Sequence, residues 1–414
     1  MKKVAIVVTI FIIAVICGQP VTAWSGGDFT FNPTLELRGE YDDNIDFDNH
    51  DEISDWLGIC IPALCFNWRT PRLEVEGTAG VEIRRYSDES EYDDEYQRYH
   101  LTSRYALTER LRLNSGASFI RDSTHDSELE ETGVVVNFYR RDRYTLNGGF
   151  DYQFSERIST GINYTYTNTD YDSPTEQDYD NHSVVGHIGY VFDDGRDQGF
   201  LQPSYSHYKS DRSRVDNYGL SLGWIRTLTE KLTLTCYLGI RYTDTEYTWH
   251  GLRPVFNPGD GTISWRRVKH TETENDIGGT ADISLAGNTE TLEYEIGFNR
   301  DLSYTSDGSP IDRNRFKGSI SWQASRRLRY AFDSSLYFSK SNDNFSKDRR
   351  RSIYEDTVYY YLHPHISYRI SENHYLQFHY RYARNRDKTL SDNKSYDRNR
   401  VWLSLVLKFP KLLD

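Results

Sequence analysis

Residues 72–84 alternate between polar and apolar side chains almost without interruption. Charged, hydroxyl or glycine residues occupy the even positions from Arg72 to Arg84, and apolar or small residues occupy the odd positions from Leu73 to Ile83. Because successive side chains of a strand point to opposite faces, this segment predicts a strand with one polar and one apolar face. The same alternation recurs along the chain. It is typical of a β-barrel that spans the outer membrane.

An export signal precedes the alternating region. Two lysines open the chain, an uncharged apolar stretch runs from Val4 to Cys17, and Val21-Thr22-Ala23 offers a small-residue cleavage site. We expect residues 1–23 to be a signal peptide and residues 24–414 to form a single barrel domain. The expected location is the outer membrane of a Gram-negative bacterium.

The composition fits a barrel better than a soluble globule. Without the two lysines of the signal, 47 basic residues face 62 acidic ones, a net charge of −15. Methionine occurs once and tyrosine 33 times, and the mean hydropathy is −0.73. A barrel needs only one apolar face on each strand, because lipid covers that face. The acidic balance also argues against nucleic acid as a partner, since nucleic acid requires basic patches.

A repeated short motif predicts the tight turns of the barrel. An apolar residue, Ser or Thr, and one or more charged residues stand between two alternating segments, as short periplasmic turns do. The copies are Leu107–Leu111, Phe154–Ile158, Leu228–Leu232, Ile370–Leu376 and the looser Ala324–Leu328, and Arg69–Pro71, Asp194–Arg196 and Gly287–Thr289 complete a set of eight.

Longer acidic stretches between these turns predict extracellular loops. They are Asp42–Ser54, Ser87–Asp94, Asp122–Phe138, Asp170–Asp180, Ser210–Val215, His250–Lys269, Ser306–Ile311, Ser341–Ile353 and Lys388–Ser395. Eight turns and nine loops give an all-β, antiparallel up-and-down barrel of eighteen strands. Sixteen strands is the alternative, because Asp122–Phe138 and His250–Lys269 could each hide or lose a hairpin.

Three cysteines follow the expected cleavage site. Cys236 lies on the apolar side of its segment and is expected to face lipid. Cys60 and Cys65 are five residues apart and so on opposite faces of a strand, and a disulfide between them would require the strand to break at Pro62. Unpaired thiols are the favoured interpretation. Cysteine spacings for haem attachment or zinc are absent from the sequence, and no cofactor is expected.

The inward positions of the strands carry charges of both signs among hydroxyl and amide side chains. The residues expected to line the lumen include Arg38, Glu74, Glu76, Arg84, Arg143, Arg241, Arg315, Lys317 and Arg381. Such a wall can bind a hydrophilic solute at many weak sites, as conduction requires. The alternative is that these charges pair across strands and merely solvate or plug the lumen.

Three further lumen candidates are histidines near the C-terminal end. A turn at residues 371–373 would place His365 opposite His379 and His363 opposite Arg381, all facing inward. Paired imidazoles suggest a transition metal or a proton-sensitive gate. No carboxylate falls in the same few positions, however, and histidine is also an ordinary polar lining residue. We therefore assign no metal ligand here.

The acidic loops could bind divalent cations. Clustered carboxylates hold calcium or bridge to lipopolysaccharide through divalent ions. The favoured alternative is solvated loops that oppose aggregation. The sequence has no nucleophile elbow of the form G-x-S-x-G, and we expect no enzymatic activity.

The sequence resembles a family of outer-membrane β-barrel porins. The resemblance rests on Asn32–Leu37 leading to Tyr41–Ile45, on the repeated Thr/Ser-Glu-Arg turns, and on the ending from Arg400 to Phe409-Pro410. Members often accompany exopolysaccharide or capsule export and exosortase systems, which implies a pore for polysaccharide or small solutes. The chain departs from the usual terminal aromatic residue, since Pro410–Asp414 follow Phe409.

Two classes of function remain open at this stage. The first is a passive pore for hydrophilic solutes, linked by the resemblance to polysaccharide export. The second is a structural or interaction barrel, either a sheath for periplasmic electron-transfer cytochromes or a surface adhesin. Expected partners are outer-membrane lipid and lipopolysaccharide, the barrel insertion machinery and polysaccharide export proteins.

Overall fold

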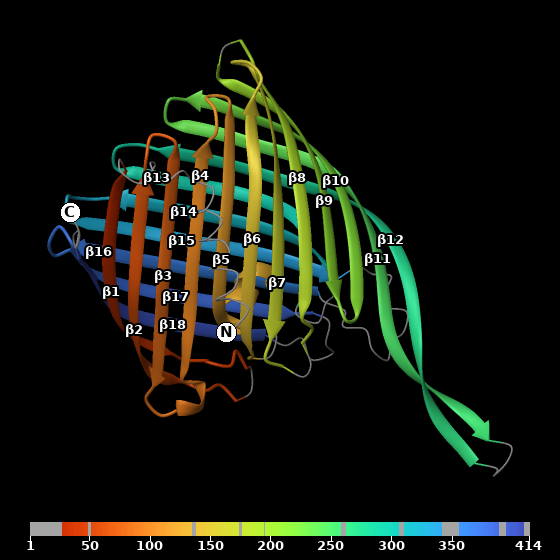
Figure 1. Cartoon of the computed structure of the whole chain (residues 1–414). Coiled ribbons are helices and arrows are strands. Elements are labelled where there is room, and N and C mark those ends of the chain that lie inside the picture. The colour runs from red at the N-terminus through yellow and green to blue at the C-terminus, as the bar shows by residue number, and fades with distance from the viewer. Residues whose placement is uncertain are drawn as a thin grey trace.

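The chain folds into one closed antiparallel β-barrel. The computed structural model describes residues 27–48, 51–134, 138–173, 176–193, 195–257, 262–305, 310–341, 356–388 and 395–409. Eighteen strands form a single sheet in these ranges, and the first strand pairs with both the second and the last (Figure 1). The predicted fold class and the count of eighteen strands are confirmed. The expected signal peptide and the residues after Phe409 lie outside the described ranges.

The strands are long enough to cross a bilayer and to extend beyond it. Their bounds are β1 (Asp28–Asp42), β2 (Asp55–Arg69), β3 (Leu73–Tyr86), β4 (Asp94–Ala106), β5 (Leu111–Ser123), β6 (Arg140–Gln153), β7 (Ile158–Tyr171), β8 (Tyr179–Val191), β9 (Asp197–Ser210), β10 (Ser213–Thr229), β11 (Leu232–Asn257), β12 (Thr262–Asn288), β13 (Leu292–Tyr304), β14 (Pro310–Gln323), β15 (Leu328–Ser341), β16 (Asp356–Arg369), β17 (His374–Asp387) and β18 (Ser395–Lys408). Within the described ranges, three short helical segments occur between strands: η2 (Ser90–Tyr92), η3 (Thr124–Glu128) and α2 (Leu129–Thr132). Across the described ranges, we find no helix with the length and apolar character to span a membrane.

The alternation in the sequence separates two faces of the wall. On β11, the side chain of Ile240 is 66% exposed, whereas its neighbour Arg241 is 3% exposed and bonded to other polar side chains. Leu222 on β10 and Ile296 on β13 are likewise 67% and 64% exposed. Large apolar side chains exposed to this degree would be unfavourable in water at about 25 cal/mol per Å². This outer face is therefore the surface for lipid.

The Ser or Thr of the repeated motif closes the short turns. Its backbone N–H donates to the carbonyl three residues on, as in Thr108 to Leu111 (3.2 Å) and Ser155 to Ile158 (3.3 Å). Its side-chain oxygen accepts N–H groups of the turn, since Thr108 Oγ1 accepts from Arg110 and Leu111. A hydroxyl at this position thus satisfies backbone donors that no strand partner can reach. All eight predicted turns lie between consecutive strands.

Three of the predicted extracellular loops differ from the structure, two of them because the strands run further than expected. The stretch Ser210–Val215 is a tight turn, in which Ser210 Oγ accepts the N–H of Ser213 at 3.1 Å. The stretch His250–Lys269 is largely strand, because β11 and β12 stay paired as far as Asn257 and Thr262 and extend beyond the rest of the barrel (Figure 1). β-Branched and aromatic residues continue the strand pattern there despite the charges between them.

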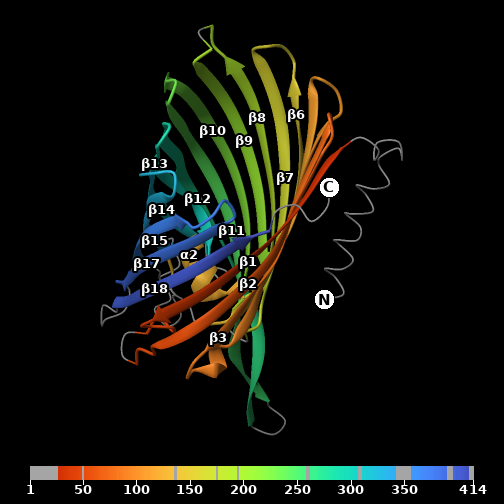
Figure 2. The ribbon, with the colours of Figure 1, turned by 90° about the vertical axis from the view of Figure 1, so that its left-hand side faces the viewer.

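The connection between β5 and β6 folds inward instead of outward. It was predicted, as Asp122–Phe138, to be an extracellular loop. Figure 2 shows α2 inside the barrel, between the strands of opposite walls. Residues 124–134, called the constriction loop below, contact β14 to β17, which lie more than 180 positions later in the sequence.

Candidate functional site: the constriction loop and a histidine cluster

Local sequence shapes the constriction loop at both ends. Ser123 caps η3, since its Oγ accepts the N–H of Asp126 at 3.3 Å. At the other end, Gly133 adopts a left-handed conformation with φ of 74° and terminates α2. A side chain at Gly133 would also clash, because a Cβ there would lie 2.7 Å from the Cβ of Tyr337. Glycine thus permits both the turn and the close approach to the opposite wall.

Hydrogen bonds attach the loop backbone to the far wall. Tyr337 Oη donates to the carbonyl of Glu130 at 2.6 Å, and Ser339 Oγ donates to the carbonyl of Thr132 at 2.5 Å. The amide of Asn385 donates to the carbonyl of Gly133 at 3.1 Å. These bonds satisfy carbonyls at the C-terminal end of α2 that the short helix leaves unpaired.

An apolar cluster lies beneath these bonds. Leu129 of the loop packs with Tyr337, Tyr359 and Ala383 of the far wall and with Phe47 from the connection between β1 and β2. All five side chains are at most 4% exposed. The loop therefore has a small hydrophobic core of its own inside the barrel.

Ion pairs attach the loop to the near wall. The carboxylate of Glu131 lies 2.5 Å from Arg143 and 3.1 Å from Arg141. Burial alone would raise the pKa of Glu131, but these two guanidinium groups outweigh it and lower the pKa to about 2. Glu131 is thus charged at neutral pH.

Two more loop carboxylates bind arginines elsewhere on the wall. Asp126 lies 2.6 Å from Arg84 and 3.4 Å from Arg400, and Glu130 lies 2.5 Å from Arg381. Burial opposes the charge on Asp126, yet the arginines hold its pKa well below the usual range. Charged bonds therefore connect the loop to β3, β6, β17 and β18.

The predicted lumen residues fall into two groups. Arg84, Arg143 and Arg381 contact the constriction loop. The others interact along the wall: Arg38 with Glu36 and Glu40, Glu74 with Arg69 and Arg104, Glu76 with Asn67, Arg241 with Asp276 and Asp312, Lys317 with Glu295, and Arg315 with the ring of Tyr337. Each of these side chains thus has a partner.

Sequence reasoning missed the loop residues themselves. Asp126, Glu130 and Glu131 stand in an acidic stretch that looks like the other loops. The available clue was Leu129 within that stretch, together with Gly133, a glycine suited to terminate a helix.

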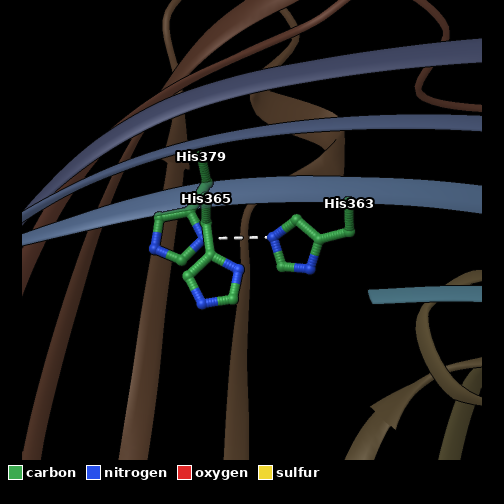
Figure 3. Close-up of side chains that lie close together, drawn as sticks. All are labelled: His363, His365 and His379. Carbon is green, nitrogen blue, oxygen red and sulfur yellow. Dashed lines mark hydrogen bonds between the residues drawn. The ribbon is translucent and has the colours of Figure 1, made fainter. Parts of the chain in front are cut away.

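The three predicted histidines lie together. His363 and His365 come from β16, and His379 comes from β17 (Figure 3). His363 Nε2 is 3.0 Å from His379 Nδ1, and one nitrogen of each ring lies within 4.8 Å of the others. The predicted pairing of His365 with His379 is confirmed, and Leu362 pairs with Tyr382 in the same register.

The expectation that no carboxylate accompanies these histidines is wrong. Asp333 on β15 lies 3.7 Å from His365 Nδ1, and it pairs with His363 across the two strands. Asp333 belongs to β15, the strand on the other side of β16, and a comparison of β16 with β17 alone does not include it. On the opposite flank, Trp402 stacks on His379 with ring centroids 4.7 Å apart.

The three described cysteines form no disulfide. Cys60, Cys65 and Cys236 are free, and β2 continues through Pro62 without a break.

At the barrel end, Asp42 binds Arg398. Binding of divalent cations by the acidic loops stays a prediction.

Comparison with known proteins agrees with this architecture. Residues 24–178 match the family described as "Putative beta-barrel porin 2". Over these residues the chain is similar to that family of porins. A search of curated proteins found no match.

Three of the solved structures that are similar to the chain are the following. OpdK of Pseudomonas aeruginosa, solved with vanillate, is 11% identical with a TM-score of 0.45, covering 92% of this chain and 99% of that one. A BenF-like porin from Pseudomonas fluorescens Pf-5 gives the same four values. The ferric citrate transporter FecA is 10% identical with a TM-score of 0.47, covering 92% of this chain and 79% of that one.

Proposed function

We propose that the protein is a passive pore for small hydrophilic solutes and that the constriction loop sets the size limit. The observation that carries this proposal is the attachment of the loop to both walls, by Glu131 to Arg143 on one side and by Tyr337 to Glu130 on the other. In this proposal, a segment attached in this way narrows the lumen and leaves a passage beside it. Its acidic side chains and the facing arginines offer polar groups to a passing solute.

The lining chemistry supports passage rather than tight retention. Charges of both signs alternate with hydroxyl groups, and the lumen residues described above have partners on the wall or on the loop, as Lys317 has Glu295 at 2.5 Å. A solute can exchange such contacts one at a time, which keeps individual sites weak. No chemical reaction is required for this function.

The expectations about export, membrane insertion and polysaccharide export are part of this proposal. Residues 1–23 would direct export and be removed, and the barrel insertion machinery would place the chain among outer-membrane lipid and lipopolysaccharide. The link to polysaccharide export requires a polymer to pass the constriction loop, so an exported chain would need that loop to move. Small solutes require a narrower opening than a polymer does, which is why we favour them.

The test is conductance with the loop loosened. In the variant Asp126→Asn/Glu130→Gln/Glu131→Gln, the loop loses its ion pairs to Arg84, Arg381 and Arg143. We expect a higher single-channel conductance in planar bilayers and uptake of larger sugars in liposome-swelling assays. Glu156→Gln, in an exposed short turn, is the matched control and should leave both values unchanged.

Two results would reject the proposal. One is the absence of current from folded wild-type protein and from a second variant in which Gly-Ser-Gly replaces residues 126–136, because the barrel would then be a plugged structural element. The other is a triple variant that conducts identically to wild type while its loop is shown to be detached, since the loop would then not limit passage.

A further inference from the structure

We propose that His363, His365 and His379 form a binding site for one divalent transition-metal ion, of the class that prefers imidazole: Cu²⁺, Zn²⁺ or Ni²⁺. This inference goes beyond the pore, because it concerns binding at one place on the wall and holds whether or not solutes pass.

The strand geometry brings the three rings to one face. His363 and His365 are two residues apart on β16 and so point to the same side, and His379 is the cross-strand partner of His365. Their neighbours Leu362, Ile366 and Phe378 are 40%, 37% and 46% exposed on the lipid side. The histidines therefore face the lumen, where an ion can arrive from water.

The nitrogen spacing suits a shared metal. With metal–nitrogen bonds of about 2.0–2.1 Å, two tetrahedral ligand atoms lie about 3.3 Å apart. The 3.0 Å between His363 Nε2 and His379 Nδ1 is close to that value, and the third ring lies within 4.8 Å of both. Small rotations of His365 about its side-chain bonds complete a three-nitrogen set, with water as a fourth ligand.

The surroundings supply the support that metal-binding histidines usually have. His365 Nδ1 is buried and has no hydrogen-bond partner, and the carboxylate of Asp333 is 3.7 Å away. With a metal on Nε2, Nδ1 carries the proton and donates it toward Asp333, an arrangement that orients the ring and strengthens the ligand. Trp402 stacks on His379 at an interplanar angle of 6° and limits rotation of that ring.

Nearby arginines do not make the site repel a cation. Arg38, Arg381 and Arg400 are close to the cluster, but each forms ion pairs with carboxylates, namely Glu36, Glu40, Asp126 and Glu130. These carboxylates and Asp333 offset the guanidinium charges beside the cluster.

The test uses untagged, chelator-stripped full-length protein refolded in detergent. Titration with Cu²⁺, followed by electron paramagnetic resonance, should show one equivalent bound per chain with nitrogen hyperfine structure, and calorimetry with Zn²⁺ should give the same stoichiometry. His363→Gln/His379→Gln should lose this binding. Asp333→Asn should weaken it by about tenfold, the usual effect of removing a carboxylate that orients a ligand.

His182→Gln/His207→Gln is the matched control, because these rings also lie on adjacent strands, with centroids 6.3 Å apart, but without a third histidine beside them. It should bind Cu²⁺ as wild type does.

Heat-modified mobility in gels verifies that each variant is folded, and the single change His365→Gln serves if the double variant does not fold. Absence of stoichiometric binding to wild type, or equal binding by folded variants that lack the cluster histidines, would overturn the proposal. The test measures metal binding and not conductance, so a failure of the metal-site proposal can be told apart from a failure of the proposed pore.

Discussion

At the scale of single residues, buried ion pairs hold the barrel end together. Arg398 on β18 donates from Nε to both carboxylate oxygens of Asp42 on β1 at 3.0 Å, and both side chains are buried. Removing one partner leaves an unpaired buried charge, which costs about 3–5 kcal/mol. We expect Arg398→Gln to lower the free energy of unfolding by that amount, measured by urea titration in lipid vesicles.

The double variant Asp42→Asn/Arg398→Gln separates this cause from lost packing. It removes both charges, so it should lose less stability than Arg398→Gln alone. If both variants are equally unstable, the unpaired carboxylate is not the reason.

Single residues also show where sequence reasoning stops. The pairing of His365 with His379 follows from one tight turn, and the structure agrees. Asp333 could not be placed in the same way, because a long connection separates β15 from β16 and leaves their register open. The partners of Glu131 and Asp126 depend on folding of the loop into the lumen, which local sequence does not encode.

At the scale of elements, the constriction loop should respond to acid. The pKa of Glu131 is about 2 in the folded chain against an ordinary 4.5, and that of Asp126 is also lowered. A lowered folded-state pKa stabilises the attached loop above pH 4.5, and this contribution is lost as the pH falls toward 2. Amide hydrogen exchange of residues 124–134, corrected for its chemical rate, should therefore show less protection at pH 3 than at pH 7.

Strand β6 provides the internal control, because its backbone hydrogen bonds join strands and do not depend on carboxylates. Its protection should stay constant over the same range. Unchanged protection of the loop at pH 3 would mean that the ion pairs contribute little to its attachment.

At the scale of the whole molecule, the long β11–β12 ribbon should be dispensable for folding. The pairs of β11 with β10 end at Tyr247, and those of β12 with β13 begin at Ala281. Because Thr248 pairs with Thr271, an Asn-Gly turn can replace residues 249–270 without a change of register. The shortened protein should refold and show the heat-modified mobility of wild type; failure to refold would assign the ribbon a part in barrel assembly.

The architecture of the whole molecule was largely predictable, for a local reason. Most of the short turns use a hydroxyl such as that of Thr108, and each strand needs its alternation, so both patterns are visible in the sequence. The ribbon was not predictable, because charged residues between its β-branched and aromatic residues resemble a loop. At its far end, the described residues of β11 pair with β12, and the sequence next to them does not indicate that pairing.

The closure of the sheet between β1 and β18 has a consequence for biogenesis. The first strand made by the ribosome finds its second neighbour only when the last one has been synthesised. Until then, every partial product carries two bare edges able to pair with other chains. Delivery to the membrane thus requires a chaperone that covers those edges until the barrel closes. A premature stop codon near the end of the coding sequence would produce an aggregation-prone fragment instead of a slightly smaller channel.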